Sequence, residues 1–384
     1  MNPIPYGTQH ITEEDVAAVV EVLQSKFLTQ GPKVREFEDK FAAYIGAKYA
    51  VAVTNGTAAL HLSAMALGVS ADSKVITTPI TFSASANCIR YCGGEVHFAD
   101  IDPETGLLDI QKVKKLLEKH PKGTFSGIVP VDFGGYPVDL KAFRELADEY
   151  GLWILEDACH APGGFFTDTT GQKHYCGDGS LAELAIFSFH PVKHIATGEG
   201  GMITTNSEEL YKKLLKYRSH GMVYQGSPDL IENHGGWYME MQELGYNYRI
   251  SDLNAALGVS QLERAATGLN RRQAIAKRYD EAFHGTKVNT FHIKSGVSHA
   301  FHLYVIQVEK RKELYDYLRT RNIFTQVHYI PVHLMPYYQN FGWKKGDFPH
   351  AEAYYNRCLS LPMFPTLTDS EQEYVISEIL GFVS

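Results

Sequence analysis

The chain has 384 residues, of which 44% are hydrophobic and 21% charged, and its formal net charge is −8. No block of Lys and Arg stands out, so this composition favours neither a nucleic-acid partner nor a membrane surface. The five cysteines form no CxxC pair, no signal-peptide-like segment opens the chain, and no uncharged apolar run reaches about 18 residues. These features predict a cytoplasmic protein without a membrane span, and the length predicts two unequal domains.

From about Thr12 to Asn206, helical and strand-like patterns alternate along the chain. Short apolar strands separated by helices are typical of a mostly parallel sheet covered by helices on both faces. The predicted strands are 49–53, 74–78, 95–100, 127–132, 152–157, 184–189 and 201–205. The predicted helices are 13–26, 57–67, 82–92, 109–119 and 139–150.

The pattern changes after about Ser251, where longer helices and shorter strands follow. An amphipathic period at the end of the chain predicts a last helix. The segments expected here are helices 251–265, 269–283, 310–321 and 369–383, and strands near 302–308 and 323–328. We therefore expect a large domain at 1–250 and a smaller C-terminal α+β domain at 251–384.

The segment LWILEDACHAPGG places Asp157 at the end of a predicted strand, whereas Glu156 faces the opposite side of the sheet. Ligands of open parallel sheets bind beyond the carboxyl ends of the strands. Asp157 is therefore a candidate ligand-binding carboxylate. An aspartate that caps a turn would produce the same local pattern.

Two other strand ends carry groups suited to a ligand. The segment VAVTNGTAALHL leads from a strand into a helix that begins near Thr57, and amides at a helix N-terminus form an anion site suited to a phosphate. Plain N-capping by Asn55 or Thr57 is the structural alternative. Phe82 follows the next strand, where its ring could lie on a flat ligand or belong to the core.

A lone lysine, Lys193, follows an apolar run in FSFHPVKHIATGEGG. An amine attacks a carbonyl group only when it is unprotonated, and burial lowers its pKa. The glycines that follow let the backbone pass close to a bulky ligand, and Ser188 could donate to a phosphate. An ion-pairing lysine is the more common reading of such a residue taken alone.

Together these features fit one cofactor, pyridoxal 5'-phosphate (PLP). PLP needs a lysine for its aldehyde, a carboxylate for its pyridinium nitrogen, an anion site for its phosphate and a flat ring for its face. Lys193, Asp157, the helix start near Thr57, and Phe82 supply these groups, all near strand ends or turns of one predicted sheet. The sequence therefore predicts a PLP site.

Nearly the whole chain resembles the sugar aminotransferases of the DegT/DnrJ/EryC1/StrS family. The motifs that carry the resemblance are AVTNGTAALHL, EDACHAPGG, FSFHPVKHIATGEGG and GYNYRISDLNAALGVSQLER. It implies an α/β protein of PLP-dependent transferase fold type I (aspartate aminotransferase-like), with a large, mixed, mostly parallel sheet domain and a smaller C-terminal α+β domain.

EDACHA and SFHPVKHIATGEGG look closest to one branch of the family, which transaminates a UDP-linked 4-keto-6-deoxy-N-acetyl-hexosamine on the route to pseudaminic acid. The resemblance implies that L-glutamate supplies the amino group, that the cofactor passes through its pyridoxamine 5'-phosphate form, and that C4 of the sugar receives the nitrogen.

The resemblance also implies roles for cofactor-binding residues. Lys193 would hold the cofactor and later move protons as a base, Asp157 would pair with the ring nitrogen, and His160 would lie near the cofactor's hydroxyl group. Phe82 would stack on the ring. The implied phosphate ligands are Gly56, Thr57, Ala58, Ser188 and, from a neighbouring subunit, Asn247. A homodimer with shared active sites is therefore expected.

Residues for the two substrates are less defined. Tyr6 is a candidate sugar contact, and His328, in VHYIPVH, is either a substrate contact or a hydrogen-bonded structural histidine. Arg249 and Arg357 are both possible partners of the glutamate carboxylate. Asp132 stands where many family members have histidine, and it receives no role.

Other functions stay open at this point. The amino acceptor could be a dTDP- or GDP-linked keto sugar, or the protein could be a regulatory PLP-binding protein without turnover. A related sugar dehydratase would carry histidine in place of Lys193. No metal site is predicted, because Pro191 breaks any helix through His190 and His194 and no metal-binding motif is present.

Overall fold

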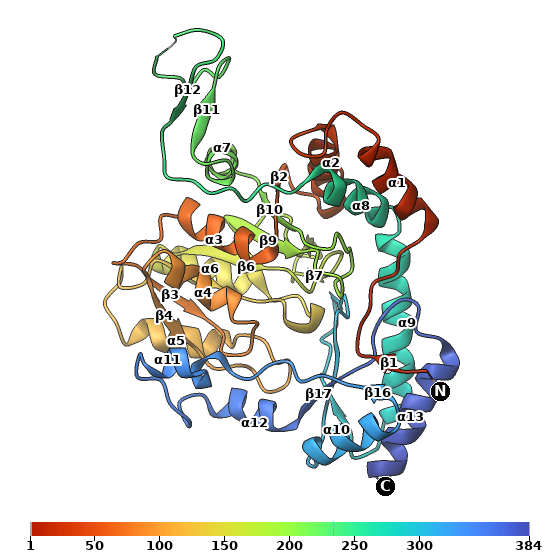
Figure 1. The fold of residues 1–384 in the computed structure, drawn as a ribbon. Helices are drawn as coiled ribbons and strands as arrows, with labels where there is room; N and C mark the ends of the chain where they lie inside the picture. Colours follow the sequence, from red (N-terminus) through yellow and green to blue (C-terminus); the bar gives the residue numbers. More distant parts are fainter. Residues whose placement is uncertain (1, 233, 384) are drawn as a thin grey trace.

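The computed structural model describes residues 2–232 and 234–383. A seven-stranded sheet with the order β2-β10-β9-β6-β5-β3-β4 forms its centre (Figure 1). β10 runs antiparallel to both of its neighbours, and the other pairs are parallel. The strands are β2 Tyr49–Val53, β3 Lys74–Thr77, β4 Glu95–Phe98, β5 Gly127–Val129, β6 Trp153–Asp157, β9 Leu184–Ser188 and β10 Gly201–Thr205. This mixed, mostly parallel sheet confirms the predicted fold class.

Successive side chains of these strands alternate between two apolar layers. Met202 on β10, with its neighbours Ala52 and Phe187, packs in a cluster with α2. The next residue, Ile203, belongs to the cluster on the opposite face, which includes α3. Burial on both faces explains why these strands read as continuous apolar runs.

Helices cover this sheet from both sides (Figure 1). Their bounds are α1 Glu13–Leu23, α2 Pro32–Ile45, α3 Gly56–Ala66, α4 Ala84–Tyr91, α5 Ile110–Glu118, α6 Leu140–Tyr150, α7 Glu208–Arg218 and α8 Asp252–Leu262. α1 is three residues shorter than predicted, and the sequence reading missed α2 and α7. α2 starts at Pro32, and Asp252 of α8 accepts the N–H groups of Gly31 and Lys33 at 2.7 and 3.0 Å.

A second core lies in the C-terminal part of the chain, around Tyr279, Ile306 and Leu314. Its elements are α9 Ala265–Phe283, β13 Asn289–Thr290, β15 Tyr304–Gln307, α10 Arg311–Thr320, β17 Cys358–Leu361 and α13 Asp369–Val383. The N-terminal Ile4 is buried in the same core, because β1 Ile4–Pro5 pairs in parallel with β16 Ile323–Phe324. The division of the chain at residue 250 stays a prediction.

The predicted strand at 323–328 is wrong in length, since only Ile323 and Phe324 form a strand. The chain then leaves this pairing, and His328 and Tyr329 reach the cavity described below. The remaining elements are β7 Phe165–Thr167, β8 Lys173–Tyr175, β14 Val297–Ser298, η1 Phe133–Gly135, η2 Val332–Leu334, α11 Pro336–Gln339 and α12 Pro349–Arg357.

A hairpin of β11 Met222–Tyr224 and β12 Met239–Met241 extends away from the sheet beyond α7 (Figure 1). Six large apolar side chains in and around it have exposed fractions between 50% and 80%. They are Tyr224, Ile231, Trp237, Met239, Met241 and Leu244. We call these residues the hairpin patch.

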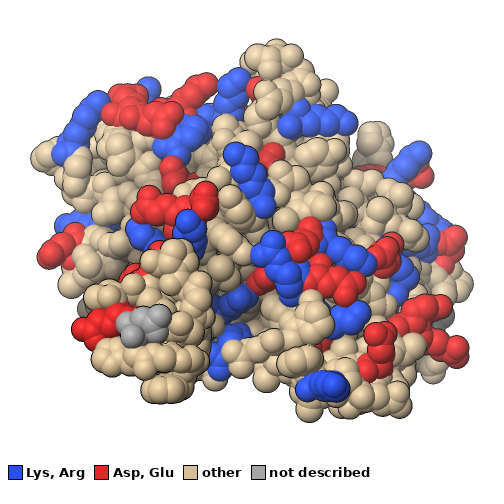
Figure 2. Space-filling model, turned by 90° about the horizontal axis from the view of Figure 1, so that it is seen from above, with Lys and Arg blue, Asp and Glu red and all other residues tan. Residues whose placement is uncertain are grey.

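Positive and negative side chains are interspersed on the face of the molecule seen in Figure 2. This arrangement agrees with the mildly acidic net charge of −8. In the part of the chain that the structure describes, no helix is long and apolar enough to cross a membrane.

Candidate active site

A cavity of about 610 Å³ opens at the carboxyl ends of the central strands. Residues that follow β2, β3, β5, β6 and β9 line it, as expected for a ligand site of an open α/β sheet. Its wall also includes Tyr6 and three residues from the C-terminal part of the chain, His302, His328 and Tyr329. Segments from the N-terminal and the C-terminal parts of the chain therefore meet the sheet at this cavity.

One end of the cavity is the N-terminus of α3. Asn55 caps this helix and accepts the N–H of Ala58 at 2.8 Å, so that amide is already paired. The first amides of a helix have no partner within it, which leaves those of Gly56 and Thr57 for an anion. A Cβ on Gly56 would lie 2.9 Å from the Cβ of Ser188, so only glycine allows α3 to approach β9 this closely.

Asp157, the last residue of β6, is a buried carboxylate on the cavity wall. Ser85 donates its hydroxyl to Oδ2 at 2.6 Å, and the Cys159 N–H donates to Oδ1 at 3.2 Å. Both bonds hold the carboxylate in one orientation. A carboxylate held in this way is suited to pair with a protonated ring nitrogen.

Lys193 lies on the cavity wall in the turn that follows β9. Burial lowers the pKa of its ammonium group from 10.5 to about 8, and the negative charge of Asp157 acts in the opposite direction. A lysine with this pKa has a useful fraction of neutral amine near neutral pH. This is the property that carbonyl chemistry requires.

His302 lies beside Lys193, with its Nε2 3.4 Å from the lysine Nζ. Its ring centroid is 4.4 Å from that of His160, whose Nε2 is 3.4 Å from the hydroxyl of Tyr329. Burial and the nearby positive charge of Lys193 hold the pKa of both histidines well below the usual range, so both rings are neutral. The sequence reading missed His302 and Tyr329, because no local motif connects them to Lys193.

The other predicted residues divide into two groups. Tyr6, Phe82 and His328 line the cavity, Phe82 with 60% of its surface exposed. His328 shares a hydrogen bond of 2.8 Å with the Ser360 hydroxyl, and burial lowers its pKa to about 3, so both readings of this histidine still apply. Asn247 and Arg249 do not line the cavity of their own chain, and Arg357 lies 4.0 Å from Glu309.

The groups present fit PLP. One wall carries an amine of lowered pKa, another a fixed carboxylate, and the start of α3 forms an anion cradle that the Cβ of any larger residue at position 56 would fill. Phe82 provides an exposed ring at the same cavity. The fold and this site define a PLP-dependent transferase of fold type I.

Residues 9–380 match the model of the DegT/DnrJ/EryC1/StrS aminotransferase family. The chain belongs to this family. It is 41% identical over 389 aligned residues to the spore coat polysaccharide biosynthesis protein SpsC of Bacillus subtilis, covering 99% of this chain and 97% of SpsC. It is 36% identical to the UDP-4-amino-4,6-dideoxy-N-acetyl-beta-L-altrosamine transaminase of Campylobacter jejuni, covering 97% and 95% of the two chains.

Solved structures give the same result. PseC of Helicobacter pylori, an aminotransferase involved in the biosynthesis of pseudoaminic acid, aligns with a TM-score of 0.88 and 31% identity over 100% of this chain and 99% of its own. Structures of the putative sugar aminotransferase Spr1654 of Streptococcus pneumoniae, 28–29% identical, are described in PLP and PMP forms. This protein is accordingly a PLP-dependent sugar aminotransferase, which overturns the regulatory alternative.

Proposed function

We propose that the enzyme transfers the amino group of L-glutamate to C4 of a UDP-linked 4-keto-6-deoxy-N-acetyl-hexosamine, as in the pseudaminic acid pathway. The observation that carries the transaminase chemistry is Lys193, an amine of lowered pKa in a cavity that also holds Asp157 and an anion cradle. The C. jejuni and H. pylori relatives support the choice of sugar.

When bound, PLP supplies an electron sink for the carbon next to the reacting nitrogen. In our proposal, Nζ of Lys193 holds the cofactor's aldehyde and later moves a proton at that carbon. Asp157, whose carboxylate Ser85 holds in place, would keep the ring nitrogen protonated. His160 would lie by the cofactor's hydroxyl, and Phe82 would cover its ring.

The remaining cofactor contacts in the proposal are to the phosphate. The amides of Gly56 and Thr57 lie at the positive end of the α3 dipole, where a phosphate is stabilised. The hydroxyl groups of Thr57 and Ser188, which both line the cavity, would donate to it. The Ala58 N–H would not bind the phosphate, because it already donates to the side chain of Asn55. Ala58 is therefore only part of the first turn of the helix.

We further propose that the active unit is a homodimer. Asn247 does not line the cavity of its own chain, which supports its expected role at the cofactor of a neighbouring subunit. The hairpin patch lies close to Asn247 in sequence and leaves large apolar side chains uncovered. Exposed apolar surface of this kind marks interaction sites.

SpsC supports a second candidate substrate, because its identity to this chain is 41% and that of the altrosamine transaminase is 36%. A different nucleotide-linked keto sugar, destined for a polysaccharide, is therefore the alternative. Tyr6 and His328 line the cavity, and in this proposal they would contact either sugar.

A substrate panel tests the proposal. The enzyme, PLP and L-glutamate are incubated with 4-keto sugars linked to UDP, dTDP or GDP, and product mass is measured. We expect the amino product from the UDP-linked N-acetyl sugar to form with the highest kcat/KM. Preference for a dTDP- or GDP-linked sugar by about tenfold or more would contradict the proposal.

Borohydride reduction of the PLP-loaded enzyme followed by peptide mapping tests the role of Lys193 separately. We expect the label on Lys193 and its loss in Lys193→Ala. A label on any other lysine would refute the assignment.

A further inference from the structure

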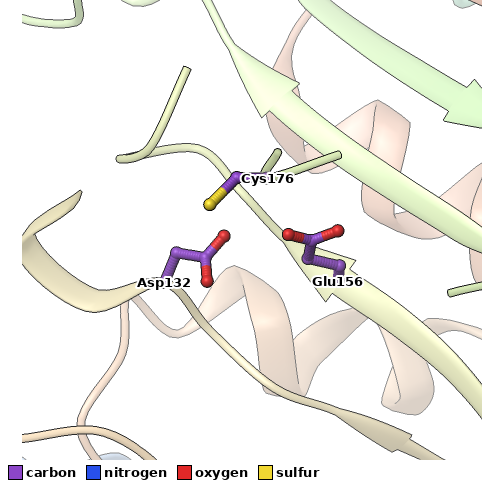
Figure 3. Close-up of side chains that lie close together, drawn as sticks. All are labelled: Asp132, Glu156 and Cys176. Carbon is purple, nitrogen blue, oxygen red and sulfur yellow. The ribbon is translucent and has the colours of Figure 1, made fainter. Parts of the chain in front are cut away.

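Three side chains meet on the face of β6 that points away from the cavity: Asp132, Glu156 and Cys176 (Figure 3). An oxygen of each carboxyl group and the sulfur lie within 4.8 Å of one another. Asp132 is 0% exposed and Glu156 2% exposed. Glu156 immediately precedes Asp157 on the strand, so the cluster lies directly behind the carboxylate of the active site.

In this cluster, one oxygen of each carboxyl group accepts a backbone hydrogen bond and the other oxygen does not. Oδ1 of Asp132 accepts the Val138 N–H at 2.8 Å, and Oε2 of Glu156 accepts the Gly177 N–H at 3.0 Å. Oδ2 of Asp132 and Oε1 of Glu156 are buried without a partner among the described residues. Two ionised carboxylates in this setting would repel each other and leave both oxygens unsatisfied.

We propose that Asp132 and Glu156 share one proton and that this acid pair positions the loop that supports Asp157 and His160. A single proton makes one free oxygen a donor to the other, so both are satisfied and the pair carries one negative charge instead of two. Burial raises the pKa of Asp132 to about 7 and that of Glu156 well above its usual range. Asp157 and Asp178 also raise these values by charge repulsion.

The third member of the cluster is a protonated thiol. A thiol binds a metal as thiolate, and burial and the two neighbouring carboxyl groups raise the pKa of Cys176 well above its usual range. The cluster therefore offers two carboxyl groups and a protonated thiol.

The loop from Asp132 to Val138 connects this pair to the active site. The Asp132 N–H donates to the carbonyl of Asp157 at 3.1 Å, and the Gly134 N–H donates to Nδ1 of His160 at 3.2 Å. The carbonyl of Gly135 accepts the Ala300 N–H at 2.7 Å, two residues before His302. Asp132 is thus a positioning residue, which acts through its neighbours and does not touch the cavity.

Infrared difference spectra of the PLP-loaded enzyme at pH 7 test the shared proton. We expect the C=O stretch of a protonated carboxyl group in the wild type and its loss in Asp132→Asn and in Glu156→Gln, because each amide replaces the proton donor. A wild type without this band overturns the proposal. Stoichiometric bound metal in the purified enzyme overturns it too.

A comparison of two variants tests the positioning role. Asp132→Asn keeps an acceptor for Val138 and a donor for Glu156, whereas Asp132→Ala removes both. We expect Asp132→Ala to lower the rate of the glutamate half-reaction at least about tenfold more than Asp132→Asn, with a smaller effect on KM. An equal loss of rate in both variants would contradict the positioning role. The glutamate half-reaction does not involve the sugar, so neither result depends on which sugar is the acceptor.

The pH dependence of stability gives an independent readout. A carboxyl group with a raised pKa in the folded state binds more protons when folded than when unfolded, so stability from this source is lost as pH rises from about 4 toward about 7. One such proton changes the unfolding equilibrium about tenfold per pH unit in this window. We expect urea titrations to show this slope in the wild type and a shallower one in Asp132→Asn. Identical slopes would refute the shared proton.

Discussion

At the scale of single residues, the chemistry depends on how burial tunes one amine. Lys193 lies beside neutral histidines, which add no positive charge that would lower its pKa further. The lysine pKa of about 8 therefore follows mainly from burial, offset in part by Asp157. The amine is partly neutral before the cofactor arrives.

This pKa predicts a pH profile for cofactor-free enzyme. At pH 7 an amine of pKa 8 has about 300-fold more neutral form than one of pKa 10.5. We expect acylation of Lys193 to rise with pH, with its midpoint near 8, and to level off above about 9, measured by competitive labelling and peptide mass. The exposed Lys277 serves as the internal control. A midpoint near 10 for Lys193 would show that burial does not lower its pKa.

We expect that His302 orients the amine of Lys193, so that replacing His302 lowers the rate of the reaction. His302→Phe keeps the ring but removes the nitrogen 3.4 Å from Nζ. We expect kcat to fall about tenfold, which equals ~1.4 kcal/mol or one hydrogen bond, while the enzyme still binds PLP. His120→Phe, outside the cavity, is the control. An unchanged kcat in His302→Phe would show that the contact between His302 and Lys193 does not contribute to the rate.

Residues at strand ends were predictable, and residues brought by the C-terminal part were not. Asp157 ends an apolar strand and Thr57 follows another, so sheet geometry alone brings them together. His302 lies 109 residues from Lys193, inside a segment that reads only as a strand. The position of His302 depends on packing between segments that are distant in the sequence, and a local sequence pattern does not predict such packing.

At the scale of elements, the start of α3 depends on its distance from β9. Gly56→Ala places a methyl group 2.9 Å from the Cβ of Ser188, so helix and strand must separate. Overpacking of this kind costs about 1–3 kcal/mol. We therefore expect the dissociation constant of PLP to rise about tenfold, measured by absorbance titration.

The matched control is Gly381→Ala in α13, where nothing lies within 4 Å of the added Cβ. We expect this variant to keep its affinity for PLP and to gain about 0.5–1 kcal/mol of stability, because alanine loses less backbone entropy than glycine in a helix. Equal affinities for PLP in Gly56→Ala and the wild type would show that the cradle tolerates a larger residue.

The elements that the sequence did not reveal are those with weak or non-local signals. β11 and β12 have three residues each and lie in an exposed hairpin, so no apolar alternation marks them. α2 carries its apolar stripe among many charged residues, and its first turn is held by Asp252, more than 200 residues away.

At the scale of the whole molecule, the hairpin patch predicts association. Trp237 is 80% exposed, and replacing a buried interface tryptophan by alanine typically costs about 2 kcal/mol or more. We expect Trp237→Ala to weaken the dimer about 30-fold in sedimentation equilibrium. Tyr175→Ala, an exposed aromatic residue on β8, is the control. A wild type that is monomeric and fully active would contradict the dimer proposal.

The pairing of β1 with β16 has a consequence for the order in which the enzyme matures on the ribosome. Ile4 finds its partner only after Ile323 has been synthesised, and Tyr6 reaches the cavity through the same pairing. The segment at Ile4–Pro5 thus leaves the exit tunnel long before residues 323–324, yet it docks only after them. A nascent chain released early would carry most of the sheet but lack a complete wall for its substrate.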